Sequence, residues 1–125
     1  ELPKGKIITG KQTDLLSPAS SVIINAIKEL SKIPDEINLL SPTILEPILK
    51  LRKNNNTLSL QEVLIALAVC SVTNPSIASA LEKLEVLKDC EAHATYIVTN
   101  GDLKALKSLK INLTCEPNFY SKEIM

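Results

Sequence analysis

A polar turn, Thr9 to Thr13, has the residue types and the position from which an anion site is built. It follows the β-branched segment 6–9 and precedes a helical pattern. A turn between a strand and a helix places unpaired backbone N–H groups beside the positive end of the helix dipole, which favours an anion. Lys11 would supply charge, Gly10 would allow close backbone approach, and the hydroxyl groups would donate hydrogen bonds. The pattern predicts an anion site here.

A second polar turn, containing Ser41 and Thr43, follows the apolar segment 37–40 in the same way. If both segments are strands of one parallel sheet, the two turns meet at one sheet edge, together with a third turn at 99–100. Both turns would then contribute to one site. The candidate ligand-binding residues are Thr9, Gly10, Lys11, Thr13, Ser41 and Thr43.

The same turns have a simpler interpretation as solvated loops whose serines cap helices. Ser17 and Ser41 each precede a proline, and Ser-Pro is typical of the cap and first position of a helix. Thr9-Gly10-Lys11 also departs from the phosphate-binding pattern G-x-x-x-x-G-K-[ST], in which the lysine lies at the start of the helix. The sequence leaves both interpretations open.

Cys90, His93 and Cys115 form the other group with chemical potential. The Cys-x-x-His spacing can bring two metal ligands together, and a cysteine on a neighbouring strand can supply a third. A lone histidine is more often a hydrogen-bonded structural residue, and the paired C-x-x-C of many zinc sites is missing. A nucleophilic role for Cys115 requires a neighbouring base, and none lies nearby in sequence. We therefore predict no metal site, keep these three residues as weak candidates, and assign no catalytic residue or cofactor.

Hydrophobic periodicity predicts the elements that must position these groups. The predicted strands are 6–9, 37–40, 92–98 and 111–115, and helical patterns start at Ser17-Pro18, Ser41-Pro42, Ser59, Asn74-Pro75 and Leu103. Strands that alternate with helices favour parallel pairing with helices on both faces. The expected fold is a three-layer α/β/α domain with about four mostly parallel strands. Its helix at 63–72 is apolar on nearly every side and should be the most deeply buried.

Composition limits the classes of protein to consider. The 125 residues have 45% apolar side chains, zero formal net charge and three cysteines. This length suits one domain with its own core. A neutral chain whose aromatic residues are Tyr96, Phe119 and Tyr120 lacks the features of a nucleic-acid binder. No apolar run is long enough to span a bilayer, and the odd cysteine count favours a reducing cytoplasm. We expect no nucleic-acid or membrane partner.

Five segments of the chain resemble one bacterial family. They are TGKQTDLLSPASSVIINAIKEL, LSPTILEPILKL, EVLIALAVCSVTNP, ALEKLEVLKDCEAHATYIV and LKINLTCEPNFY. The resemblance runs along most of the chain, from Gly5 to about Tyr120. These segments look like the C-terminal domain of DUF1846, a family with no established activity. The resemblance implies a three-layer α/β/α arrangement and additional domains ahead of this one. It also implies that residues 1–125 form one domain, the C-terminal part of a longer protein. Some relatives carry a zinc-protease label, but this chain has no His-Glu-x-x-His motif.

The sequence therefore supports three hypotheses. The first is a module of a larger cytoplasmic protein that binds an anionic metabolite or a nucleotide phosphate. The second is a structural domain without a site of its own, which contacts the N-terminal domains of the same protein or forms a homo-oligomer. The third is a metal-assisted hydrolase-like domain, which depends on Cys90, His93 and Cys115.

Overall fold

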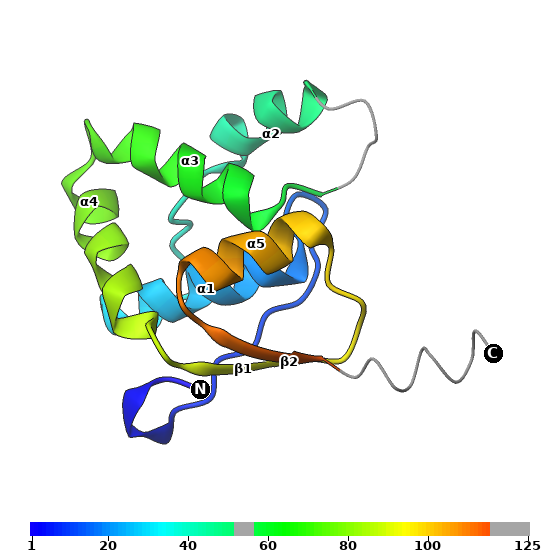
Figure 1. The fold of residues 1–125 in the computed structure, drawn as a ribbon. Coiled ribbons are helices and arrows are strands. Elements are labelled where there is room, and N and C mark those ends of the chain that lie inside the picture. The colour runs from blue at the N-terminus through cyan, green and yellow to red at the C-terminus, as the bar shows by residue number, and fades with distance from the viewer. Residues whose placement is uncertain (52–56, 116–125) are drawn as a thin grey trace.

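A computed structural model describes residues 1–51 and 57–115 (Figure 1). Within them, five α-helices and two short 3₁₀ segments accompany two strands. In chain order the elements are η1 (Pro3–Gly5), α1 (Pro18–Leu30), α2 (Pro42–Lys50), α3 (Leu60–Ser71), α4 (Pro75–Glu82), η2 (Lys83–Leu87), β1 (Glu91–Ala94), α5 (Asn100–Ser108) and β2 (Asn112–Cys115). Figure 1 shows the strands side by side in the lower part of the view, with α2 and α3 at the top.

Several helices begin where the sequence predicts. The Ser17 hydroxyl accepts a hydrogen bond from the Ser20 backbone N–H at 3.2 Å, and Pro18 takes the first position of α1. At α3, Ser59 and Glu62 form the predicted capping box, in which each side chain accepts from the other residue's backbone N–H. Asn74 caps α4 by the same principle. These starts are confirmed because local capping chemistry alone decides them.

The sheet is smaller than the sequence predicts. β1 and β2 pair in parallel, with Glu91 opposite Asn112 and Ala94 opposite Cys115, and α5 makes the crossover between them. Segments 6–9 and 37–40 are not strands. The domain is therefore a mixed α/β fold with a two-stranded parallel sheet in its described residues, and the prediction of four strands in three layers is wrong. Local pattern indicates that a segment can extend, but a strand also needs a distant partner for its backbone groups.

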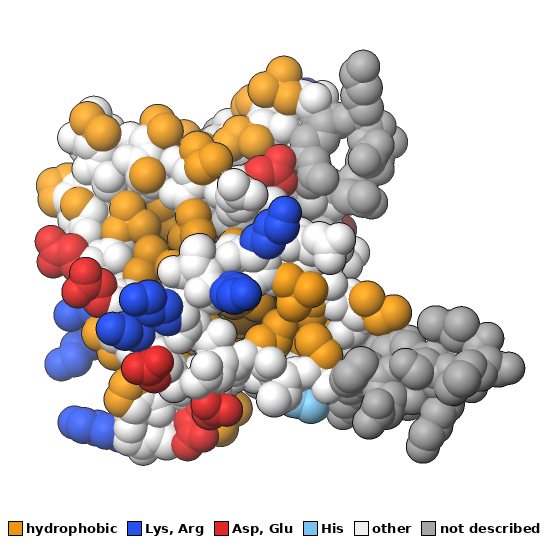
Figure 2. All heavy atoms as spheres, in the orientation of Figure 1, with side chains coloured by type: hydrophobic (Ala, Val, Ile, Leu, Met, Phe, Trp, Pro, Cys, Tyr) orange, Lys and Arg blue, Asp and Glu red, His pale blue; other side chains and the backbone are white. Residues whose placement is uncertain are grey.

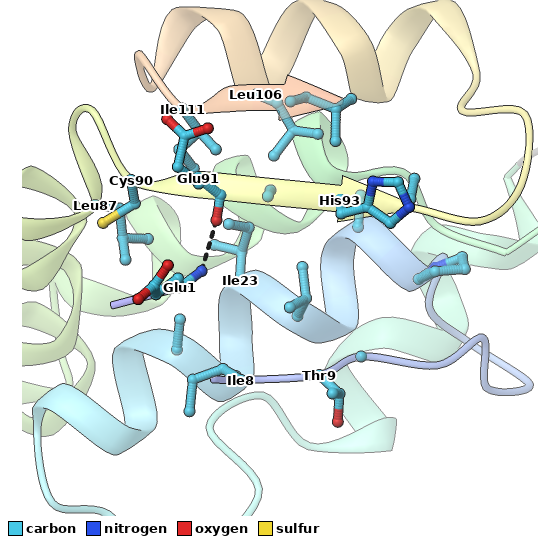
Figure 3. A pocket seen from close by; sticks show the side chains of 18 of the residues that line it. Glu1, Ile8, Thr9, Ile23, Leu87, Cys90, Glu91, His93, Leu106 and Ile111 are labelled. Atoms are coloured by element: carbon cyan, nitrogen blue, oxygen red, sulfur yellow. Dashed lines mark hydrogen bonds between the residues drawn. The ribbon is translucent and has the colours of Figure 1, made fainter. Parts of the chain in front are cut away.

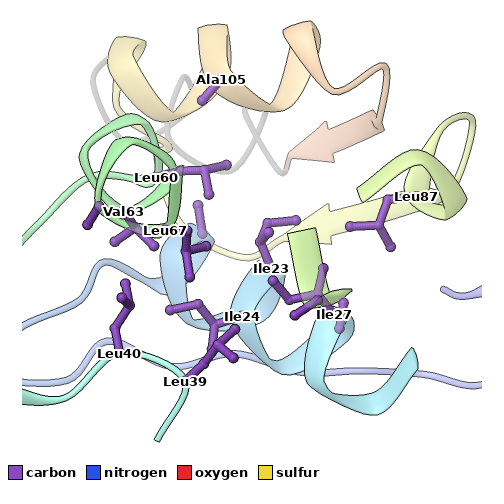
Figure 4. Packing of buried hydrophobic residues seen from close by; sticks show 14 of the residues in the cluster. Ile23, Ile24, Ile27, Leu39, Leu40, Leu60, Val63, Leu67, Leu87 and Ala105 are labelled. Atoms are coloured by element: carbon purple, nitrogen blue, oxygen red, sulfur yellow. The ribbon is translucent and has the colours of Figure 1, made fainter. Parts of the chain in front are cut away.

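The hydrophobic core lies among the helices (Figure 4). Its fully buried side chains include Ile27 of α1 and three residues of α3, Leu60, Val63 and Leu67, each with no more than trace exposure. Figure 4 shows α1 and α3 approaching each other through these side chains, with Leu87 from η2 at one end of the cluster. The core therefore fixes how α1 and α3 pack against each other.

The prediction that helix 63–72 is the most deeply buried element is correct for only one of its faces. Val63 and Leu67 are fully buried, whereas Ile65, Val69 and Val72 are 58%, 67% and 82% exposed. The reason is geometric, because the described residues supply packing partners to one side of α3 only. An apolar helix face thus remains in solvent.

Candidate functional site

The N-termini of α1, α3 and α5 converge at one place. The chain segments that enter α1 and α3 are joined by a parallel bridge between Leu16 and Leu58. The Leu58 carbonyl accepts from the Ser17 backbone N–H at 3.0 Å and from the Ser20 hydroxyl at 3.0 Å. Ser20 is fully buried, so this contact is shielded from water. The two helix starts are held side by side.

Asp102 ties the start of α5 to the same point. Its side chain is 1% exposed, and its Oδ1 accepts from the Leu60 backbone N–H of α3 at 2.8 Å. Its own backbone N–H donates to the Thr99 hydroxyl, which caps α5, at 3.3 Å. One buried carboxylate therefore lies at two helix N-termini, where the helix dipoles favour negative charge. Thr99 and Asp102 have the spacing of a capping box, and that signal in the sequence was missed.

A polar cavity of about 860 Å³ opens in front of the three helix starts. Hydroxyl, amide and carboxylate groups dominate its walls. The lining residues are Gln12, Thr13, Asp14, Ser17, Pro18, Thr57, Ser59, Gln61, Glu62, Tyr96, Ile97, Thr99, Gly101 and Asp102. Among the described residues, this lining contains three carboxylates and no lysine or arginine. The cavity is suited to a ligand that donates hydrogen bonds, such as a sugar or other polyol.

An apolar cavity of about 480 Å³ lies beside it, between the N-terminal segment, α1 and β1 (Figure 3). In Figure 3, Ile8 and Thr9 lie on one side of this space and His93 on the other. Most other lining side chains are aliphatic. Glu1 lies at one end, where its nitrogen donates a hydrogen bond to the Glu91 carbonyl oxygen (dashed line in Figure 3). Such walls suit the apolar part of a small molecule.

Tyr96 and Pro18 belong to the linings of both cavities, so the two spaces adjoin. Partial burial of the phenol raises the pKa of Tyr96 above its usual 10.0, and the nearby Asp102 carboxylate raises the pKa further. A backbone hydrogen bond from Ala19, in the first turn of α1, acts in the opposite direction and lowers it. The tyrosine thus remains protonated well above neutral pH and can donate a hydrogen bond to a ligand. Tyr96 is not among the ligand-binding residues predicted from the sequence.

The predicted ligand-binding residues are divided between places in the structure. Thr9 and Gly10 line the apolar cavity, while Thr13 lines the polar cavity together with Thr99. Segment 9–13 therefore borders both cavities, and Lys11 lies in sequence between the residues that line the one and those that line the other. Lys11 is exposed, makes no ion pair within the described part of the chain, and is absent from both linings.

The second predicted turn is not part of either lining. Ser41 and Thr43 lie at the N-terminus of α2, where their hydroxyl groups hydrogen-bond to each other at 2.7 Å. Neither residue lines the two cavities. The sheet edge that was expected to bring the two turns together does not form, because the segments before them are not strands.

The cysteine and histidine candidates do not assemble into a metal site. His93 on β1 is exposed, and its Nδ1 hydrogen-bonds to the Thr114 hydroxyl at 3.0 Å. Cys115 lies opposite Ala94 in the sheet, and Cys90 precedes β1; both are free thiols. Across residues 1–51 and 57–115, no three His, Cys, Asp or Glu side chains form a group that could hold a metal ion. Phe119 and Tyr120 lie outside the described residues.

Comparisons with known proteins agree on one family. A family model described as "Domain of unknown function DUF1846, C-terminal" matches residues 1–125. The chain is 45% identical to a UPF0371 protein of Clostridioides difficile (strain 630) and 47% identical to one of Clostridium botulinum (strain Eklund 17B / Type B). Each match covers 99% of this chain but 26% of the relative, so the chain spans about a quarter of these relatives' length. No helix among the described residues is long and apolar enough to cross a membrane.

Proposed function

Since the chain belongs to the DUF1846 family, in which it corresponds to the C-terminal domain, we propose a function from its geometry. The domain is a module of a larger cytoplasmic protein, and this module binds a small anionic metabolite, such as a nucleotide phosphate. The observation that carries this proposal is the path of segment 9–13. It borders an apolar cavity at Thr9 and Gly10 and a polar cavity at Thr13, and the two cavities adjoin at Tyr96.

The charges in the polar cavity decide where the anionic group belongs. Asp102 already lies at the N-termini of α3 and α5, and the Glu62 carboxylate accepts the Ser59 backbone N–H at 2.9 Å. A phosphate placed among these carboxylates would meet like charges in a partly desolvated space. Lys11 is the cationic residue of segment 9–13, and its side chain is exposed. The phosphate therefore binds on the Lys11 side, and the ligand's hydroxyl groups donate to the carboxylates.

The division of the walls supports a ligand with two unlike parts. The aliphatic cavity beneath Thr9 accepts a flat or apolar group, and the hydroxyl-rich cavity beside Thr13 accepts a sugar-like group. Tyr96 lies at their junction and offers a phenol that stays protonated at neutral pH. This combination resembles the parts of a nucleotide. The hydrolase-like alternative has no comparable support, because the described residues form no metal-binding group.

An NMR titration of backbone amides at constant ionic strength tests the proposal. The probes are adenosine monophosphate, adenosine and inorganic phosphate. We expect the nucleotide to shift the amide signals of segment 9–13 and Tyr96 at lower concentration than adenosine does. Lys11→Ala should weaken nucleotide binding by about tenfold or more, because a charge-assisted hydrogen bond contributes about 1.5–3 kcal/mol. Stability should be unchanged, since Lys11 is exposed.

Lys104→Ala is the matched control, because Lys104 is also exposed, lies on α5 and lines neither cavity. It should leave nucleotide affinity unchanged. Equal binding of adenosine and the nucleotide would remove the phosphate from the proposal. Equal losses in the two lysine variants would show general charge attraction, and the proposed site would then be rejected.

A further inference from the structure

Four apolar side chains form a solvent-exposed stripe along α3 and its C-cap. They are Ile65, Ala68, Val69 and Val72, which we call the α3 stripe. Their spacing of i, i+3, i+4 and i+7 places them on one helix face. In Figure 2, hydrophobic side chains gather over α3 in the upper left of the molecule, where no charged side chain interrupts them. The three larger side chains are between 58% and 82% exposed.

The opposite face of α3 is already the centre of the core. Leu60, Val63 and Leu67 are completely buried against α1 and its neighbours. A helix that is apolar all round is normally buried all round, and a surface helix normally carries charges on its outer face. Glu62 is the one charged residue of α3, and it is used in the capping box. The sequence of α3 thus fits a helix with a second packing partner.

The length of the relatives indicates what that partner is. The match covers 26% of each relative, and the family model identifies the matched part as C-terminal. About three quarters of the polypeptide therefore precedes this domain in those proteins. We propose that the α3 stripe is the surface on which this preceding part of the same polypeptide docks.

The size of the stripe favours docking within one polypeptide over a dimer of this domain. A stable interface between separate chains involves about 20–30 residues on each side. The stripe has four residues, too few to hold two separate copies together. Within one chain, a linker raises the effective concentration of the partner to about the millimolar range, so a small apolar contact suffices.

Figure 1 places the amino terminus at the lower edge and α3 at the top, so the preceding part must extend around the domain. In the relatives, the preceding part is about three times the size of this domain, which is large enough to reach α3.

The test compares the 125-residue chain with the full-length polypeptide that carries it. Hydroxyl-radical footprinting, read by mass spectrometry, measures how fast each side chain is oxidised. We expect Ile65, Val69 and Val72 to be oxidised at least fivefold more slowly in the full-length protein than in the 125-residue chain. If the stripe is oxidised equally fast in both, it is not a docking surface and the proposal is wrong.

A pair of matched variants identifies the occupant. Ile65→Lys places a charge in the stripe, and Ile37→Lys places the same charge on an isoleucine of similar exposure, 53% against 58%, outside any helix. Both isoleucines are more than half exposed, and lysine is a good helix former at position 65, so neither variant should unfold the 125-residue chain. In the full-length protein, Ile65→Lys should restore fast oxidation of Val69 and Val72, whereas Ile37→Lys should not.

Sedimentation of the 125-residue chain completes the test. A monomer at about 100 μM supports docking within the polypeptide, since a standard two-chain interface would give association at that concentration. A dimer that Ile65→Lys dissociates and Ile37→Lys does not would assign the stripe to a second copy and overturn the proposal. Failure of the nucleotide titration would leave this result unaffected, because none of the four stripe residues lines either cavity.

Discussion

Gly10 allows the most decisive single-residue test of the fold around the candidate site. A Cβ at this position would lie 2.3 Å from the Val22 backbone nitrogen, 2.6 Å from its Cα and 2.7 Å from its Cβ. Real Cβ atoms essentially never approach closer than 3.0 Å, so the two segments would have to separate by at least 0.7 Å. Val22 lies inside α1, which also carries the core residues Ile23 and Ile27. The helix is fixed, and segment 9–13 must move.

Gly10→Ala is therefore expected to lower the free energy of unfolding by about 1–3 kcal/mol, the usual cost of forcing extra atoms into a packed contact. With a urea m-value of about 2 kcal/mol per molar, a loss of about 2 kcal/mol lowers the denaturation midpoint by about 1 M. The variant should also weaken nucleotide binding, because the segment that borders both cavities is displaced.

Gly101→Ala is the matched control and should change stability in the opposite direction. Gly101 lies in the first turn of α5, and a Cβ there meets no atom within 4 Å. Alanine in a helix is favoured over glycine by about 0.5–1 kcal/mol, so the midpoint should rise. If Gly10→Ala unfolds at the wild-type urea concentration, segment 9–13 does not pack on α1, and both cavities described above would be incorrect.

Two further predictions concern the buried carboxylate and the tyrosine between the cavities. Asp102→Ala should lower the free energy of unfolding by about 1–3 kcal/mol, because it leaves the buried Leu60 N–H without its acceptor; Asp102→Asn keeps an acceptor oxygen, and urea denaturation should show a smaller loss. For Tyr96, the raised pKa means that the folded state holds the phenol proton more tightly than the unfolded state, whose value is near 10.0. This stabilising contribution to folding is fully present below pH 10 and is lost as pH rises through the higher pKa of Tyr96 in the folded state. Thermal melts between pH 9 and 11 should therefore show a steeper fall of the melting temperature for the wild type than for Tyr96→Phe.

The helices were predictable because their starts depend on neighbouring residues. Ser17-Pro18, Asn74-Pro75 and the Ser59–Glu62 capping box are each contained within a few positions, and each begins a helix in the structure. The alternation around His93 was predictable for the same reason: residues 93, 95 and 97 are exposed, and 94 and 98 are buried. The strand itself ends at Ala94, because its length depends on pairing with β2.

The strands at 6–9 and 37–40 were predicted wrongly because sequence pattern gives no information about pairing. Ile7 and Ile37 are β-branched, yet they are 65% and 53% exposed, without a neighbouring strand in the described residues. The predicted site depended on those strands, since only a shared sheet edge would bring Ser41 and Thr43 to segment 9–13. The structure instead assembles its polar cavity from helix starts.

The joining of three helix starts explains why this cavity was hard to foresee. Each cap is visible in the sequence alone, but the Leu16–Leu58 bridge and the Asp102–Leu60 hydrogen bond span 42 positions each. Such contacts form only when the core has placed α1, α3 and α5 together. One face of α3 supplies buried side chains to that core. The helix that positions the cavity thus presents its other face, the α3 stripe, to solvent. If the preceding part of the polypeptide packs on that face, it acts on the element that anchors Asp102, and ligand binding at the cavities should respond to docking.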